Sequence, residues 1–189
     1  MKRILVIALS AACIAAGFVM REKNIGHRMP HADEAEQATT ASALIDTGVY
    51  KYNPNGPHGP TLYYWAAETL GVQPADAQIS DFRKTLDPIA AALLILLVLT
   101  GRYLGRTAAW AGAACLAMSA FFQIYSGYFV HEIIFAALVY ALALAAWQFA
   151  CSPNVWLALL AGILLGFSQA TKETAVISYA AMAGSFAVC

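Results

Sequence analysis

The stretch LDPIAAALLILLVLTGRYL, residues 86–104, decides the class of fold. Its one acid lies near the start, its one arginine lies near the end, and an apolar run separates them. A helix of about 20 predominantly apolar residues is long enough to cross the hydrocarbon core of a bilayer. The stretch therefore predicts a membrane-spanning helix.

Apolar runs of the same kind lie on both sides of this stretch. The predicted complete spans are 4–20, 86–104, 107–125, 133–150 and 155–170. A sixth run starts near Ala175 and is still apolar at Cys189. A helix that stops inside the bilayer leaves its last carbonyls without partners. We therefore expect an all-α polytopic membrane protein, of which residues 1–189 are the N-terminal part.

Composition agrees with a membrane protein. The chain is 60% hydrophobic and 12% charged, whereas soluble domains are about 45–50% apolar and about 25% charged. Its net charge is zero, which gives no general attraction to nucleic acid. The four cysteines show no paired spacing, so they predict neither a disulfide framework nor a metal motif.

The first apolar run has two interpretations. A basic start, an apolar run and several small residues are typical of a secretory signal peptide. Because further apolar runs follow, we favour a retained signal anchor. Both interpretations place residue 21 on the outer side of the membrane.

Positive charge predicts the orientation. Lys2 and Arg3 precede the first span, and Arg102 and Arg106 flank a short connection. Such residues are enriched on the cytoplasmic side. Loop 21–85 also contains six Lys and Arg residues, but long loops translocate largely regardless of charge. We therefore expect loop 21–85, segment 125–132 and residues 172–173 to face outward, in the cytoplasmic membrane.

Two short helices are predicted inside loop 21–85. Residues 31–45 follow Pro30 and are rich in Ala, Glu and Gln, with Gly48 as the stop signal. The second runs over 61–70, with Thr61 as its N-cap, and is rich in Tyr and Trp. Because Tyr and Trp favour the headgroup level, we expect this helix to lie in the membrane interface.

Asp33 and Glu34 form the most reactive pair in the loop. Neighbouring residues on a helix point about 100° apart, so one carboxylate can face a reaction site while the other holds a partner or a metal. Alternatively, both are helix N-terminal charges that the helix dipole favours. Three polar clusters on one side of the membrane favour the functional interpretation.

Several motifs together resemble a known family. They are RMPHADE (28–34), TGVYKYNP (47–54), HGPTLYY (58–64), YSGYFVHE (125–132) and ATKET (170–174). The chain resembles the N-terminal part of GT-C glycosyltransferases, close to the flippase activity-associated membrane proteins and similar to the protein mannosyltransferases. It departs from the family at Gly127, where an arginine is expected. The resemblance implies transfer of a sugar from a polyprenyl-phosphate carrier to an acceptor glycan, lipid or protein at the outer face of the bilayer.

The resemblance also implies residue roles. Asp33 would be the general base and Glu34 its catalytic neighbour. The substrate-binding residues would be His58, Tyr128, His131, Glu132 and Lys172. A divalent metal is possible, with Asp33, His131 and Glu132 as its candidate ligands. Lys172 alternatively extends to the interface and pairs with Glu173.

Three alternatives concern the protein as a whole. It could be a non-catalytic scaffold or a flippase-associated subunit of a glycosylation system. A transporter fits less well, because the predicted spans are almost free of charge whereas transporters hold polar groups near the midplane. We do not expect residues 1–189 by themselves to be active.

Overall fold

The computed structural model describes residues 2–53 and 58–188. Apart from one isolated bridge between His58 and Lys172, the described residues form helices, turns and loops. The helices are α1 (Lys2–Ile25), α2 (Ala32–Thr47), α3 (Thr61–Thr69), α4 (Ile79–Lys84), α5 (Asp87–Leu99), α6 (Gly101–Leu104), α7 (Arg106–Met118), α8 (Ala120–Tyr125), α9 (Glu132–Cys151), α10 (Val155–Thr171) and α11 (Ala175–Val188). The predicted all-α class is confirmed.

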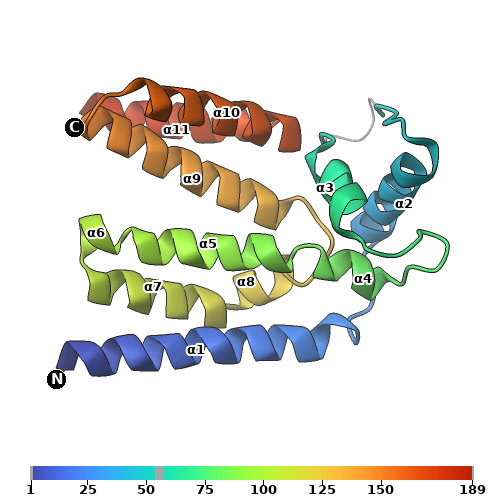
Figure 1. Ribbon diagram of the computed structural model, residues 1–189, viewed down its shortest axis with the longest axis horizontal. Coiled ribbons are helices and arrows are strands. Elements are labelled where there is room, and N and C mark those ends of the chain that lie inside the picture. Colours follow the sequence, from blue (N-terminus) through green and yellow to red (C-terminus); the bar gives the residue numbers. More distant parts are fainter. Residues whose placement is uncertain (1, 54–57, 189) are drawn as a thin grey trace.

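The long helices form a row of roughly parallel rods, with α1, α7, α5, α9 and α10 in that order (Figure 1). Each helix of the row packs on the next, and α11 lies against α10. Helices α2, α3 and α4 gather at one end of the row (Figure 1). We call this end, together with segment 126–131, the polar end.

Three helical segments are long and apolar enough to cross a membrane: Lys2–Ile25, Ile79–Leu104 and Glu132–Cys151. They correspond to the first, second and fourth predicted spans, and they fit a membrane protein. α10 is apolar but shorter than these segments, and so is the apolar stretch Ala175–Ser185 within α11. The predicted span 107–125 is divided into α7 and α8.

The division between α7 and α8 has a local cause. Ser119 is extended, with φ −71° and ψ 145°, and its hydroxyl accepts a hydrogen bond from the backbone N–H of Phe122 at 3.1 Å. Serine favours this N-cap position because its side chain satisfies an otherwise free N–H group. The apolar run therefore predicts a helical segment here but not the break at Ser119.

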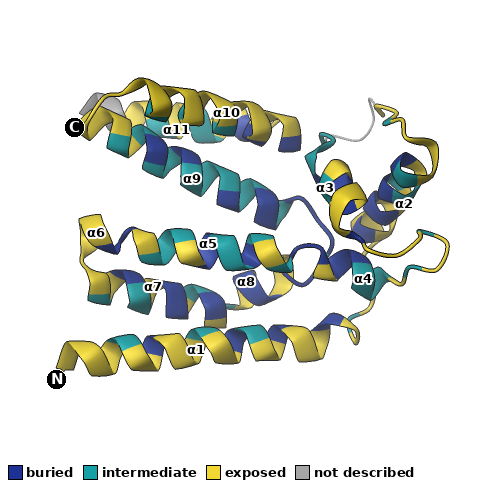
Figure 2. Cartoon of the chain, in the orientation of Figure 1, coloured by how far each residue is buried: buried dark blue, intermediate teal, exposed yellow. Residues whose placement is uncertain are grey.

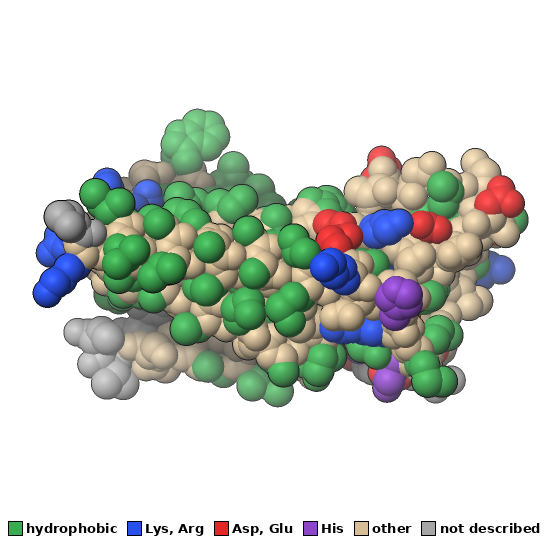
Figure 3. Space-filling view, turned by 90° about the horizontal axis from the view of Figure 1, so that it is seen from below, with side chains coloured by type: hydrophobic (Ala, Val, Ile, Leu, Met, Phe, Trp, Pro, Cys, Tyr) green, Lys and Arg blue, Asp and Glu red, His purple; other side chains and the backbone are tan. Residues whose placement is uncertain are grey.

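The helices of the row differ in how far their side chains are exposed, and charged side chains lie at the ends of the row. Large hydrophobic side chains are exposed along α1 and α10, whereas buried residues concentrate on α5, α7 and α9 (Figure 2). In a view onto α1, hydrophobic side chains cover the middle and charged groups lie at both ends (Figure 3). An apolar band between two charged ends is the pattern expected of helices that cross a bilayer.

α1 and α7 pack closely. A Cβ atom added to Gly17 would lie 2.7 Å from the carbonyl oxygen of Ala117. The side-chain amide of Gln123 donates to the carbonyl oxygens of both residues, at 2.9 Å to Gly17 and 2.7 Å to Ala117. A small residue lets two helix backbones approach, so Gly17 fixes α1 against the rest of the row.

Candidate functional site

Helix α2 places the predicted acidic pair at the polar end. His31 is its N-cap, and its Nδ1 accepts a hydrogen bond from the backbone N–H of Asp33 at 3.3 Å. The helix ends at Gly48, which has φ 69° and whose N–H donates to the carbonyl of Leu44. Positive φ suits glycine because it has no Cβ. The predicted helix 31–45 is thus present, with slightly shifted bounds.

Glu34 points into the protein and is fully buried. Its two carboxylate oxygens accept hydrogen bonds from Nε and Nη2 of Arg83, each at 2.7 Å, and Arg83 is fully buried too. The backbone N–H of Phe129 donates to the same carboxylate at 2.8 Å. Glu34 therefore ties α2 to α4 and to segment 126–131. This geometry favours a structural role for Glu34, and its predicted catalytic role stays untested.

A second buried arginine strengthens the polar end. Arg21 forms ion pairs with Glu22 and Asp87 and donates to the carbonyl oxygen of Ser126. It thereby joins the end of α1 to the start of α5 and to segment 126–131. Sequence reasoning counted Arg21 and Arg83 only as loop charges. The acids of the same loop are the only sequence signal that these arginines could form ion pairs. Only the fold shows which acid each arginine meets.

Asp33 has the opposite environment. Its side chain is 65% exposed, and Nδ1 of the His31 imidazole lies 3.6 Å from its carboxylate. It borders a pocket of about 300 Å³, which is lined by His31, Asp33, Ile124, Tyr125, Tyr128, Val130 and Glu132. We call this cavity the acidic pocket. It gathers three predicted site residues, Asp33, Tyr128 and Glu132, around one space.

Lys172 is connected to the acidic pocket through Glu132. Its ammonium group donates to the Glu132 carboxylate at 2.6 Å. The alternative partner Glu173 instead accepts a hydrogen bond from the hydroxyl of Tyr52 at 3.3 Å. The predicted pairing of Lys172 with Glu173 is therefore replaced by a cross-helix pair that links α9 and α10.

The segment around His58 docks on the end of α10. The N–H of Gly59 donates to the carbonyl of Thr171 at 3.2 Å, and His58 and Lys172 form the isolated bridge. A Cβ atom at Gly59 would lie only 1.9 Å from the carbonyl oxygen of Ala170. Only glycine permits this approach. The preceding residues 54–57 lie outside the described residues.

His131 faces the docked segment, and it is not among the residues that line the acidic pocket. It is fully buried, its Nε2 lies 3.1 Å from the carbonyl oxygen of Gly59, and its ring stacks on His58 with centroids 4.7 Å apart. Burial first, and the neighbouring His58 second, lower the pKa of His131 to about 4. The Nδ1 atoms of both rings are buried and have no hydrogen-bond partner among the described residues. His58 and His131 thus form a stacked pair that supports the loop.

The candidate metal ligands are not brought together as one set. Across residues 2–53 and 58–188, no group of three or more His, Cys, Asp or Glu side chains could hold a metal ion. Asp33 and Glu132 border the same pocket, but Glu132 already pairs with Lys172 and His131 faces Gly59. This donor set does not fit a resident divalent cation.

The aromatic helix α3 differs from its prediction. It starts at Thr61, but its N-cap is Pro60 and no side chain caps it. Leu62 and Tyr63 are buried, and the indole N–H of Trp65 donates to the carbonyl of Thr85 at 2.6 Å. Burial raises the pKa of Tyr63 to about 12. Half of this helix belongs to the core of the polar end, and Tyr64 remains exposed.

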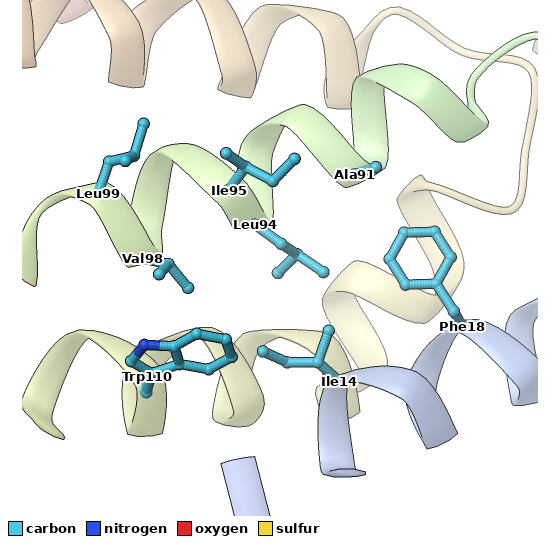
Figure 4. A pocket seen from close by; sticks show the side chains of 8 residues that line it. All are labelled: Ile14, Phe18, Ala91, Leu94, Ile95, Val98, Leu99 and Trp110. Carbon is cyan, nitrogen blue, oxygen red and sulfur yellow. The ribbon is translucent and has the colours of Figure 1, made fainter. Parts of the chain in front are cut away.

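Two apolar hollows adjoin the docked segment. One, of about 430 Å³, lies among α3, α5, α9 and α10, and the other, of about 390 Å³, lies between α3 and α10. They share Thr61, Trp65 and Phe167. A further apolar hollow between α1, α5 and α7 is lined by residues such as Phe18 and Trp110 (Figure 4). It contains no titratable group and therefore offers no reaction chemistry.

Comparison with family models, with curated proteins and with solved structures finds no match for this chain. The resemblance to GT-C glycosyltransferases therefore remains a prediction from the sequence motifs.

Proposed function

We propose that the protein is a membrane glycosyltransferase of the GT-C type, which moves a sugar from a polyprenyl-phosphate carrier to an acceptor hydroxyl at the outer face of the membrane. The observation that carries the proposal is the contrast between the two neighbouring acids. Glu34 is buried in an ion pair, whereas Asp33 is exposed at the acidic pocket. A fixed helix start with one free carboxylate is a suitable arrangement for a general base.

The chemistry assigns one step to each group. The acceptor hydroxyl attacks the anomeric carbon of the sugar, and its proton passes to the Asp33 carboxylate. The bond between the anomeric carbon and the carrier's phosphate oxygen breaks, and the phosphate leaves as an anion. A positioned cation stabilises charge that develops on a leaving group. Lys172, which Glu132 orients at 2.6 Å, is the candidate cation.

Apolar space near the polar end would suit a lipid-linked donor. The apolar hollows that share Thr61, Trp65 and Phe167 offer space for hydrocarbon next to the polar end. Burial of each CH₂ group contributes about 0.8 kcal/mol. A carrier with a long hydrocarbon chain can therefore bind through these hollows while its phosphate and sugar lie at the polar end.

Asp33→Asn tests the proposal. The protein is made from its native gene in membranes, and transfer of a radiolabelled sugar from a lipid-linked donor is measured. We expect the rate to fall by about 10²- to 10⁴-fold, because Asn keeps the shape of Asp but does not accept a proton. Glu36→Gln is the matched control, since Glu36 is an exposed acid on the same helix.

One outcome contradicts the catalytic role of Asp33, and a second experiment then decides between the alternatives. Transfer at the parent rate in Asp33→Asn would show that another group is the base. If deletion of the gene also lowers glycosylation in cells, the scaffold or flippase-associated function becomes the better account, because the protein would then be needed without its proposed base.

A further inference from the structure

Arg28 is a cation beside the acidic pocket, and it pairs with no acid in the part of the chain that the structure describes. Arg21, Arg83 and Lys172 each pair with a carboxylate. Within the described part of the chain, no carboxylate oxygen lies within 4.0 Å of the Arg28 guanidinium. The Arg28 side chain is only half-buried. Its charge is therefore available to an anion from outside the protein.

Gly127 makes the room that Arg28 occupies. A Cβ atom at position 127 would lie 2.8 Å from Nη1 and 3.3 Å from Cζ of Arg28. The same Nη1 donates to the carbonyl oxygen of Gln123 at 2.7 Å. These contacts hold one edge of the guanidinium. Its Nε and Nη2 donate to no acceptor among the described residues, and they remain available for a ligand.

The guanidinium also contacts the wall of the acidic pocket. Its Nη1 lies 3.5 Å from the carbonyl oxygen of Ile124, and its Cζ lies 5.6 Å from the centre of the Tyr128 ring. Ile124 and Tyr128 both line the pocket. The Tyr128 ring has a second guanidinium, that of Arg83, at 5.1 Å. Tyr128 thus contacts two guanidinium groups and holds Arg28 at the pocket wall.

We propose that Arg28, placed over Gly127 and against Tyr128, is the residue that binds the phosphate of a phosphorylated lipid at the acidic pocket. This inference rests on the proposed function for the identity of its ligand. Arginine suits the role because its planar fork donates two parallel hydrogen bonds to a phosphate. Lys172 shares its charge with Glu132 and Asp33 repels an anion, so Arg28 adds a positive charge that no carboxylate of the described residues neutralises.

A purely structural role for Arg28 makes a different prediction. Its bonds to the carbonyls of Gln123 and Ile124 also satisfy the C-terminal end of α8. If capping α8 is its only role, removal of Arg28 weakens binding of charged and uncharged lipids alike. If Arg28 binds phosphate, only the charged lipid loses affinity.

The test measures binding of farnesyl monophosphate, farnesol and inorganic phosphate to the purified protein in detergent. We expect the parent to prefer farnesyl monophosphate over farnesol by at least about 10-fold. Arg28→Gln should weaken farnesyl monophosphate binding by about 10- to 100-fold, the range for hydrogen bonds to a charged group. Farnesol binding should not change, and neither should any affinity in the control Lys51→Gln, which removes an exposed cation.

A second variant separates the charge of Arg28 from its hydrogen bonds to α8. Arg28→Lys keeps a cation at the pocket wall but lacks the planar fork of arginine. We expect its preference for farnesyl monophosphate to lie between those of the parent and Arg28→Gln. A preference in Arg28→Lys no greater than that in Arg28→Gln would overturn the proposal, and so would a parent protein that binds both lipids equally.

The results also separate this inference from the proposed function. An Arg28-dependent preference for farnesyl monophosphate without any sugar transfer supports the phosphate site and contradicts the glycosyltransferase. Sugar transfer that survives in Arg28→Gln with unchanged KM for the donor contradicts the role of Arg28 alone. Competition by millimolar inorganic phosphate would show that the site recognises the phosphate by itself rather than a lipid headgroup.

Discussion

The ion pair between Glu34 and Arg83 should be the main stabilising contact of the polar end. Glu34→Gln keeps the shape of the side chain but leaves the Arg83 charge buried, with backbone carbonyls such as that of Ile25 as its remaining partners. Removal of one partner from a buried ion pair costs about 3–5 kcal/mol. We expect about 3 kcal/mol, because the amide oxygen of Gln still accepts one hydrogen bond. Native domains have only about 5–15 kcal/mol of total stability.

Denaturant unfolding in mild detergent, followed by circular dichroism, measures this loss. Glu36→Gln is the matched control, since it makes the same chemical change on an exposed face of α2 and should cost less than about 0.5 kcal/mol. The double variant Glu34→Leu with Arg83→Met should be more stable than Glu34→Gln, because neither charge then needs a partner.

The reasoning is refuted if Glu34→Gln and Glu36→Gln unfold at the same denaturant concentration. In that case the Glu34 carboxylate is not desolvated in the folded protein. The contrast between Glu34 and Asp33, on which the assignment of the general base depends, would then be lost.

Two further predictions concern the docked segment. Gly59→Ala should lower the free energy of unfolding by about 1–3 kcal/mol and expose the segment to protease, because its Cβ would collide with the backbone of α10. The control is Gly162→Ala, where a Cβ meets nothing within 4 Å. Equal protease resistance of the two variants would contradict the docking. The pKa of His131 is lowered to about 4 in the folded state, so folding favours its neutral form. The stability that this preference contributes is complete above about pH 6.5, the usual pKa of histidine. It should be lost as the pH falls from about 6.5 to about 4. Unfolding at pH 7 and pH 4.5 measures this loss, which should be smaller in His131→Gln; an identical pH dependence in both proteins would show that His131 does not titrate on unfolding.

Local signals in the sequence account for much of the secondary structure. Pro30 and Gly48 bound α2, and the apolar run after Pro88 forms α5. These predictions succeeded because caps, prolines and apolar runs act over a few residues. The prediction of span 107–125 was incomplete because one hydroxyl, that of Ser119, starts a new helix inside an apolar run.

The candidate site was predicted only in part. Asp33, Tyr128 and Glu132 line one pocket, which is consistent with three polar clusters at one end of the molecule. The sequence assigned the general base to Asp33 only through the family resemblance, because neighbouring acids have the same local context. Their difference arises from Arg83, which is distant in the chain and meets only one of them.

The sequence by itself determined the helical class and the polar character of segments 21–85 and 125–132, since these follow from composition and short-range periodicity. Only the tertiary structure decided which charges are paired and which are free. Glu34, Arg21 and Arg83 became parts of a buried network, while Asp33 and Arg28 kept no strong ionic partner among the described residues. The physical reason is that a carboxylate or guanidinium acquires its role from the groups it meets after folding, and those groups come from segments far apart in the chain.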